Sequence, residues 1–168
     1  MSQYLMETGY GGRTLMVDAS REMVHRARRK SEDKKGNFVV LADVNHLPIK
    51  SGVIDGAMCT FSLTTIRHPE DAVEELTRTL VNEGLLVVLD SEKPSNPAGR
   101  FIYRALVPIS RLFCHTQIDR DVRGILSCNG KLAESGRKGY MGGMVAIHVC
   151  KKTCKAVDNT EIMVTDYR

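Results

Sequence analysis

The chain has 168 residues, of which 42% are hydrophobic and 26% charged, with a net charge of +4, as is typical of one soluble globular domain. Only 5% of the residues are aromatic and none is Trp, which argues against a nucleic-acid surface built on base stacking. No apolar run is long enough to span a bilayer, and no charged-then-apolar leader opens the chain. We therefore expect a cytoplasmic protein.

The cysteines indicate a reducing compartment. Their number, five, is odd, and no two of them form a CxxC pair. Cys150 and Cys154 have no histidine partners nearby, which makes them a poor zinc site. Cys59 and Cys150 fall inside apolar runs, where a reduced thiol behaves as a small hydrophobe. We expect no metal site.

The first third of the chain alternates helix and strand patterns. Residues 2–9 (SQYLMETG) have the spacing of a helix end with a glycine stop, and residues 13–18 (RTLMVD) predict a strand. Residues 20–35 predict a helix with Ser20 as its N-cap and a basic end that suits the helix dipole. Residues 37–43 (NFVVLAD) are a near-continuous apolar run, typical of a parallel strand covered on both faces.

The middle of the chain continues this alternation. Residues 53–62 (VIDGAMCTFS) predict a buried strand, and residues 68–84 predict an amphipathic helix that stops at Gly84. Residues 85–90 (LLVVLD) predict another buried strand. Strands and helices that alternate in this way predict an open, largely parallel α/β sheet.

The last third of the chain is less regular. Residues 118–130 predict a helix, and residues 131–135 and 142–152 suit two closing strands, which we expect to be antiparallel. Residues 96–113 carry three arginines beside a broad apolar face. This stretch either admits a lipophilic substrate at a membrane surface or packs on the sheet with its basic residues outward.

The domain organisation that follows is simple. One domain covers residues 1–152, and a polar tail covers residues 153–168. Within the tail, residues 161–167 (EIMVTDY) have the composition of an edge strand.

Three acidic residues stand at or just after predicted strand ends: Asp18, Asp43 and Asp90. In open α/β sheets, ligands bind beyond the carboxyl ends of the strands, so these positions are candidates, with a capping or turn role as the alternative for each. Asp18 is the best placed, because Ala19 and Ser20 make a tight turn into a helix that lets its carboxylate accept two ribose hydroxyls. Asp43 is able to accept from an exocyclic amine.

Several blocks of the chain resemble class I S-adenosylmethionine-dependent methyltransferases: VDASREMV, GNFVVLADVNHLPIKSGVID and PEDAVEELTRTLVNEGLLVVLD, in that order. More narrowly, DSEKPSNPAGRFIYRALVP and YMGGMVAIHVCKK are similar to the C-methyltransferases of ubiquinone and menaquinone biosynthesis. The resemblance covers residues 14–152, more weakly between 113 and 140. It implies S-adenosylmethionine as cofactor and a Rossmann-like α/β fold. Its sheet would be mostly parallel, with helices on both faces and an antiparallel closing strand pair.

The resemblance also implies roles for individual residues. Asp18 would hold the ribose of the cofactor, with Ala19 and Ser20 lining the adenosine. Asp43 and the backbone N–H of Val44 would read the adenine edge. The residues that follow the next strand would lie near the cofactor's reactive end; they are Thr60, Phe61 and Ser62. Methyl transfer from a sulfonium needs alignment of the reacting groups more than it needs an acid or a base.

The chain departs from this family in two places. The family's first strand and its glycine-rich loop, which approaches the methionine end of the cofactor, are missing, so we expect two strands of the sheet to lack a shared neighbour. Where the family tends to show Gly-Leu-Arg-Asn, this chain has Ser62, Leu63, Thr64 and Thr65. Substrate contacts from that loop therefore do not carry over.

Three histidines have distinct expected roles. His46 precedes Leu-Pro on a predicted active-site loop, where it is either a base for a phenol or enol proton or a solvent-exposed residue. His68 stands at a helix N-terminus, where a capping or solvent role is expected because the dipole disfavours the cation. His148 lies in an apolar strand and is expected to be a satisfied core or edge residue.

Two hypotheses for function remain open, and with them the question whether the chain is an enzyme. The first is a methyltransferase that uses S-adenosylmethionine on a quinol-like or other lipophilic small molecule, with His46 as a base. The second is a catalytically inactive or partial methyltransferase-fold protein that acts as a binding or assembly partner, unless the natural start lies upstream of Met1. Expected partners are the small-molecule substrate, a peripheral membrane contact and a second copy or chain that supplies the missing strand, but no nucleic acid.

Overall fold

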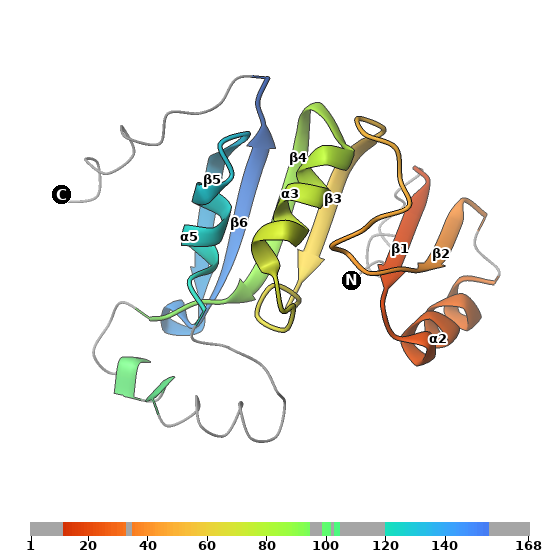
Figure 1. Cartoon of the computed structure of the whole chain (residues 1–168). Helices are drawn as coiled ribbons and strands as arrows, with labels where there is room; N and C mark the ends of the chain where they lie inside the picture. The colour runs from red at the N-terminus through yellow and green to blue at the C-terminus, as the bar shows by residue number, and fades with distance from the viewer. Residues whose placement is uncertain (1–11, 33–34, 95–98, 102, 105–119, 155–168) are drawn as a thin grey trace. The chain divides into compact units, whose positions relative to one another are not determined.

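Figure 1 shows the computed structural model, which describes residues 12–32, 35–94, 99–101, 103–104 and 120–154. The contacts divide the chain into two units, Met1–Pro48 and Ile49–Arg168. Within the described ranges, no helix is long and apolar enough to cross a membrane. The assignment of residues 1–152 to one domain and of the remainder to a tail stays a prediction.

The first unit is a strand, a helix and a second strand. β1 (Thr14–Asp18) and β2 (Asn37–Leu41) pair in parallel, and α2 (Arg21–Ser31) connects them. Ser20 caps α2 as predicted, because its Oγ accepts a hydrogen bond from the N–H of Met23. The parallel pairing means that both strands end at the same edge.

Two elements of this unit end earlier than predicted. α2 ends at Ser31 rather than at residue 35, and there the Ser31 hydroxyl donates to the C=O of Ala27, a bond that competes with the helix ladder. β2 ends at Leu41 rather than at Asp43. The Asp43 side chain instead accepts from the N–H of Asn45 and starts a turn.

The second unit is a four-stranded sheet in the order β3-β4-β6-β5. Its strands are β3 (Ile54–Thr60), β4 (Leu80–Ser91), β5 (Leu132–Tyr140) and β6 (Val145–Lys152). β3 and β4 are parallel, whereas β6 pairs antiparallel with both β4 and β5. The predicted α/β fold with parallel strands and an antiparallel closing pair is confirmed, although β5 is longer than the stretch 131–135.

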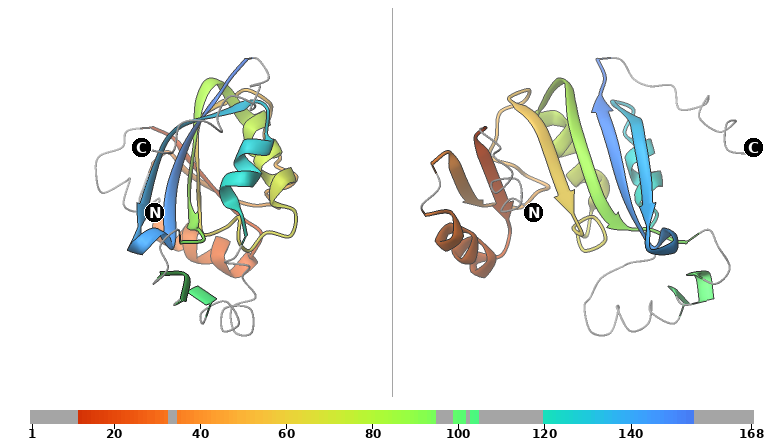
Figure 2. Two further views of the ribbon diagram at one scale, coloured as in Figure 1. Left: turned by 90° about the vertical axis from the view of Figure 1, so that its left-hand side faces the viewer. Right: turned by 180° about the vertical axis from the view of Figure 1, so that it is seen from behind.

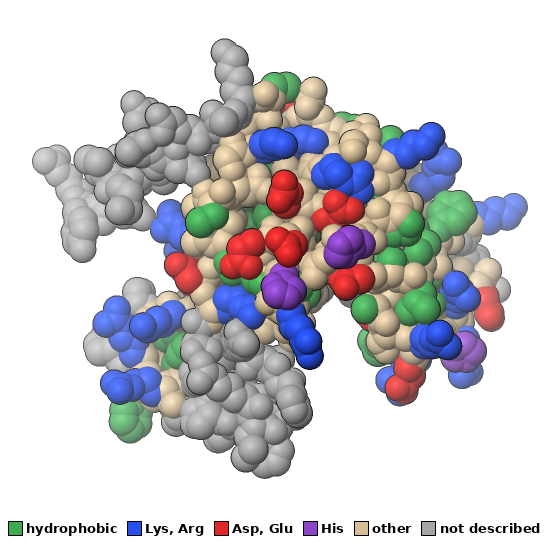
Figure 3. Space-filling model, viewed as in Figure 1, with side chains coloured by type: hydrophobic (Ala, Val, Ile, Leu, Met, Phe, Trp, Pro, Cys, Tyr) green, Lys and Arg blue, Asp and Glu red, His purple; other side chains and the backbone are tan. Residues whose placement is uncertain are grey.

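Two helices cover one face of this sheet, α3 (Pro69–Thr79) and α5 (Val122–Cys128), and they contact one another (Figure 2). Alternate residues of the central strands point toward them and form the core, for example Leu86, Val88 and Cys150. Helices on both faces were predicted, and the described residues show them on one face. The outer side of α3 is a solvated face, over which acidic side chains gather (Figure 3).

The helix predicted over residues 68–84 is shorter than expected. α3 ends at Thr79, and Leu80 already has an extended backbone and pairs with Ile54. The pairing then jumps to Gly56 with Leu85, so that residues 81–84 bulge from the strand. Gly84 therefore serves a close backbone approach in this bulge rather than a helix stop: a Cβ there would lie 2.9 Å from the C=O of Val81.

The remaining elements complete the description. A short 3-10 turn, η1 (Met141–Gly143), joins β5 to β6, and α5 confirms the helix predicted over residues 118–130. In the described part of the chain, β1 pairs with β2 alone and β3 pairs with β4 alone. The patterns predicted over residues 2–9 and 161–167, and most of 96–113, lie outside the described residues.

Candidate functional site

The carboxyl edge of the first unit brings two of the predicted site residues together. Asp18 is the last residue of β1, and Asp43 follows the end of β2 by two residues. The backbone ties them, because the N–H of Ala42 donates to the C=O of Asp18 over 3.2 Å. Both carboxylates are exposed at the edge where ligands of open α/β sheets bind.

The turn after β1 orients the Asp18 carboxylate through one of its two oxygens. Its Oδ1 accepts a hydrogen bond of 2.8 Å from the N–H of Ser20, which orients the side chain across Ala19. Within the described residues Oδ2 has no partner. Ser20 in turn caps α2, whose N-terminus carries the positive end of the helix dipole beside this turn.

The turn after β2 has the same arrangement. Oδ1 of Asp43 accepts from the N–H of Asn45 over 3.0 Å, and its C=O accepts from the N–H of His46 over 3.0 Å. Among the residues that the structure describes, Asp43 Oδ2 and the N–H of Val44 have no hydrogen-bond partner. The side-chain oxygen of Asn45 is buried without a partner in the same turn.

These groups define what this edge can bind. Two oriented carboxylates with one open oxygen each accept hydrogen bonds, and the Val44 N–H donates one. A ribose diol presents two donors, and adenine presents an amino donor beside a ring acceptor. The donor and acceptor set could therefore match the polar groups of a purine nucleoside.

The other predicted site residues lie in the second unit, at the end of β3. Thr60 is the last residue of the strand, and Phe61 takes a left-handed backbone conformation with φ 49° while its N–H donates to Leu89. The Phe61 side chain is 51% exposed. The Ser62 hydroxyl donates to the C=O of Thr60 over 2.9 Å, so it stabilises the turn rather than facing a ligand freely.

Cys59 stands directly before this turn and is not a nucleophile. It is 8% exposed, and burial raises its pKa to about 11. At neutral pH the group is therefore a thiol, and the thiolate is the reactive form. Cys59 behaves as the small buried hydrophobe that the sequence predicts.

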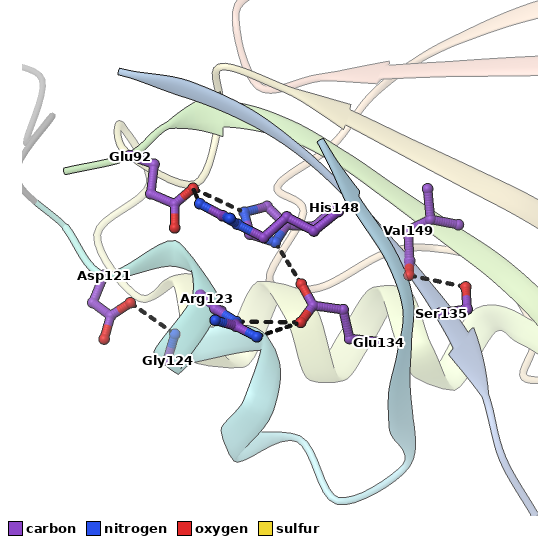
Figure 4. A network of polar contacts seen from close by, with 9 residues as sticks. Glu92, Asp121, Arg123, Gly124, Glu134, Ser135, His148 and Val149 are labelled. Carbon is purple, nitrogen blue, oxygen red and sulfur yellow. Dashed lines mark hydrogen bonds and ion pairs between the residues drawn. The ribbon is translucent and has the colours of Figure 1, made fainter. Parts of the chain in front are cut away.

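Of the three histidines considered in the sequence, two are exposed and one is buried. His46 is exposed in the turn after β2, and His68 is exposed at the N-terminus of α3 without a side-chain capping bond. His148 is buried, and its Nδ1 lies 2.9 Å from Oε1 of Glu134, which confirms the expected core residue (Figure 4). Ion pairs extend this network, from Arg123 to Glu134 and from Arg137 to Glu92.

The third strand-end acid, Asp90, is not open to a ligand. It is 1% exposed, and both of its carboxylate oxygens accept hydrogen bonds from Thr64. In the sequence, Thr64 stood out only as part of a stretch that departs from the family pattern, and its bonds to Asp90 were not predicted. Arg120, which contacts the same loop, belongs to no recognisable motif, so no sequence signal marked it. Within the described ranges, no cluster of His, Cys, Asp and Glu could hold a metal ion.

The chain is similar to known proteins in both sequence and fold. A family model described as a methyltransferase domain matches residues 1–88. The ubiquinone/menaquinone biosynthesis C-methyltransferase UbiE of Pseudomonas paraeruginosa is 31% identical over 162 residues, which cover 92% of this chain and 57% of that protein. UbiE of Stutzerimonas stutzeri is 33% identical over 97 residues, covering 56% of this chain and 38% of that one. The chain thus spans less than two thirds of these relatives.

Solved structures show the same fold. The YcgJ protein of Bacillus subtilis superposes with a TM-score of 0.70 at 15% identity, covering 90% of this chain and 87% of that one. A geranyl diphosphate methyltransferase in complex with S-adenosylmethionine gives a TM-score of 0.72 at 12% identity, covering 90% of this chain and 73% of that one. At these identities the likeness is one of fold.

Proposed function

Because the chain belongs to the methyltransferase-domain family, we propose that it binds S-adenosylmethionine and transfers its methyl group to a quinol-like or other lipophilic small molecule. Relatives named for ubiquinone and menaquinone biosynthesis support this class of acceptor. The observation that carries the proposal is the carboxyl edge of the first unit. There, two oriented carboxylates and a backbone N–H match the polar groups of an adenosine.

The proposal assigns a task to each residue of that edge. Oδ2 of Asp18 accepts from the ribose hydroxyls, while Oδ1 keeps its bond to Ser20. Ala19 borders the adenosine through the tight turn. Asp43 accepts from the adenine amino group, and the Val44 N–H donates to the neighbouring ring nitrogen.

The turn after β3 has the second task in this proposal. Thr60, Phe61 and Ser62 border the reactive end of the ligand, where the bound cofactor supplies an electrophilic methyl group on a sulfonium. The chain's contribution is alignment and exclusion of water, since displacement at such a carbon needs little acid or base help. His46, exposed in the turn after β2, accepts the proton of the acceptor hydroxyl.

Two further parts of the proposal concern partners. Within the described residues, β1 and β3 each have one edge without a strand partner. Each of these edges supports pairing with a further strand, supplied by another segment or by a second chain. Peripheral membrane contact through residues 96–113 would give a lipophilic acceptor access to the protein. Light scattering and vesicle sedimentation test these two points directly.

Calorimetric titration with S-adenosylmethionine and S-adenosylhomocysteine tests the cofactor site. Asp18→Asn keeps an acceptor for the Ser20 N–H and replaces the open, charged oxygen with a neutral NH2 group, which donates rather than accepts. Hydrogen bonds to a charged group contribute about 1.5–3 kcal/mol, so the affinity should fall roughly 10- to 150-fold. Asp71→Asn, on the solvated face of α3, is the matched control and should bind like the wild type.

Each of three outcomes would contradict one part of the proposal. An Asp18→Asn variant that binds as tightly as Asp71→Asn would show that the Asp18 carboxylate does not hold the ribose. A folded wild-type chain that binds neither compound would refute cofactor binding. Binding without methyl transfer to a quinol panel would refute the enzymatic part and leave the cofactor site standing.

A further inference from the structure

A buried carboxylate anchors residues 61–66, the first part of the loop between β3 and α3. Asp90, on β4, is 1% exposed, and its Oδ1 accepts from the Thr64 hydroxyl over 2.8 Å. Its Oδ2 accepts from the Thr64 N–H over 3.3 Å. Thr64 is itself 3% exposed, so these bonds are shielded from water. Buried bonds to a charged acceptor are among the stronger ones in proteins.

A second contact holds the same loop through its carbonyl groups. Nη1 of Arg120, just before α5, donates to the C=O of Leu63 over 2.6 Å and to the C=O of Ile66 over 2.5 Å. The Leu63 side chain is fully buried. The loop is therefore held by two charged side chains: a carboxylate accepts from one of its backbone N–H groups, and a guanidinium donates to two of its C=O groups. We call Asp90, Thr64 and Arg120 the loop clamp.

The loop clamp holds a strained residue in place. Phe61 has φ 49°, a conformation that L-residues with large side chains rarely adopt, and its ring is 51% exposed. Strain of this kind persists only where the surroundings over-determine the backbone, and it is common at functional sites. The loop clamp begins three residues after Phe61, and Leu89 accepts from the Phe61 N–H. The result is an aromatic side chain held out of the core by a loop that is itself fixed.

We infer that Asp90 and Arg120 are positioning residues, which fix the Phe61 ring so that it borders the ligand. This inference rests on the proposed function, in which the turn after β3 lies at the reactive end. Alignment is the main contribution that the protein makes to such a reaction, so a mobile loop would lower the rate and the affinity. Neither residue touches the ligand, and both act through the loop.

The chain offers a clean probe of the loop. It contains no Trp, so Phe61→Trp introduces a single fluorophore at the position that the loop clamp is inferred to fix. In this background, Thr64→Val removes the hydroxyl bond to Asp90, and Thr64→Ser restores it. Thr77→Val is the matched control, because Thr77 is equally buried and its hydroxyl bonds Val73 within α3, away from the loop. Asp90→Asn and Arg120→Met complete the set.

Time-resolved anisotropy of the tryptophan reports loop order without any ligand. We expect Thr64→Val, Asp90→Asn and Arg120→Met to increase the fast, local component of the decay at least twofold. Thr77→Val should lose as much stability toward urea as Thr64→Val does, but its anisotropy decay should not change. Thr64→Ser should have the same anisotropy decay as the parent. If Thr77→Val loosens the tryptophan as much as Thr64→Val does, the effect is general destabilisation and the inference is wrong. An unchanged decay in all three clamp variants overturns it as well.

A second measurement separates this inference from the proposed function. This measurement uses the chain that keeps Phe61. Where the wild type binds S-adenosylhomocysteine, Thr64→Val should weaken binding about two- to tenfold, the loss typical of one hydrogen bond. Thr64→Ser and Thr77→Val should not weaken it. If Thr64→Val loosens the loop but leaves a measurable affinity unchanged, the clamp does not position the ligand site and the inference falls. If the wild-type chain binds nothing, the proposed function fails, while the anisotropy of the tryptophan variants still decides whether the clamp fixes the residue at position 61.

Discussion

The two buried cysteines predict how the stability of the second unit depends on alkaline pH. Burial raises the pKa of Cys59 from 9.0 to about 11 and that of Cys150 likewise to about 11, with Glu134 contributing to the second shift. Cys59 is 8% exposed and Cys150 1% exposed, so solvent screens neither of them strongly. The folded state therefore retains the thiol protons over a pH range in which the unfolded chain has lost them.

The difference in pKa between the folded and unfolded states sets the sign and the size of the change in stability with pH. Each thiol contributes its full stabilisation below the unfolded pKa, and the contribution is lost as the pH rises toward the folded pKa. With 1.36 kcal/mol for each pKa unit, each thiol should remove about 2 kcal/mol of stability between pH 8 and pH 10.5. Lysines and tyrosines also titrate there, so only a comparison between variants isolates the thiols.

Urea unfolding of wild type and Cys59→Ala at both pH values is the assay. At pH 8 the variant should be less stable by about 1–2 kcal/mol, because a buried group is truncated. At pH 10.5 the gap should shrink by about 2 kcal/mol and close or reverse. Cys128→Ala, at an exposed thiol that ends α5, should leave the pH dependence of the wild type unchanged. Parallel pH profiles for wild type and Cys59→Ala would refute the reasoning.

Two more predictions concern the same unit. Gly84→Ala should destabilise it by about 1–3 kcal/mol, because the new Cβ would lie 2.9 Å from the C=O of Val81 and 3.1 Å from that of Asp55; an unchanged urea midpoint would contradict this. In a double-mutant cycle, His148→Leu and Glu134→Gln should show a coupling of about 0.5–3 kcal/mol, because they are in direct contact at 2.9 Å and the His148 ring is buried. A coupling within error of zero would show that the network contributes packing only.

Most elements of the fold were predictable because hydrophobic period and helix capping are local properties. The continuous apolar runs became β2, β3 and β4, and Ser20 caps α2 as its position before the helix indicated. The order of these elements predicted the parallel pairs, and the two closing strands, which were expected to be antiparallel, pair antiparallel with one another. In these cases the local preference and the tertiary structure agree.

The errors occur where tertiary contacts override a local signal. Gly84 resembles a helix stop in sequence, yet α3 ends at Thr79 because Leu80 pairs with Ile54. The glycine instead serves a bulge, which depends on the backbone of a strand far away in sequence. The role of Arg120 could not be predicted for the same reason, since the residues that it contacts lie more than fifty positions earlier in the chain. Local patterns carry no information about such contacts.

The candidate site gives the sharpest case of this limit. Asp18, Asp43 and Asp90 all stand at or just after a predicted strand end, and this position alone made all three candidates for ligand binding. Burial separates them. Asp18 and Asp43 are exposed, and one local N–H fixes one oxygen of each and leaves the other open, whereas Asp90 is buried with both oxygens bonded to Thr64. A buried carboxylate whose oxygens are bonded within the fold is closed to a ligand, so the same residue type near a strand end has two different roles in one chain. The first two carry the proposed adenosine contacts, and the third holds the loop that carries Phe61.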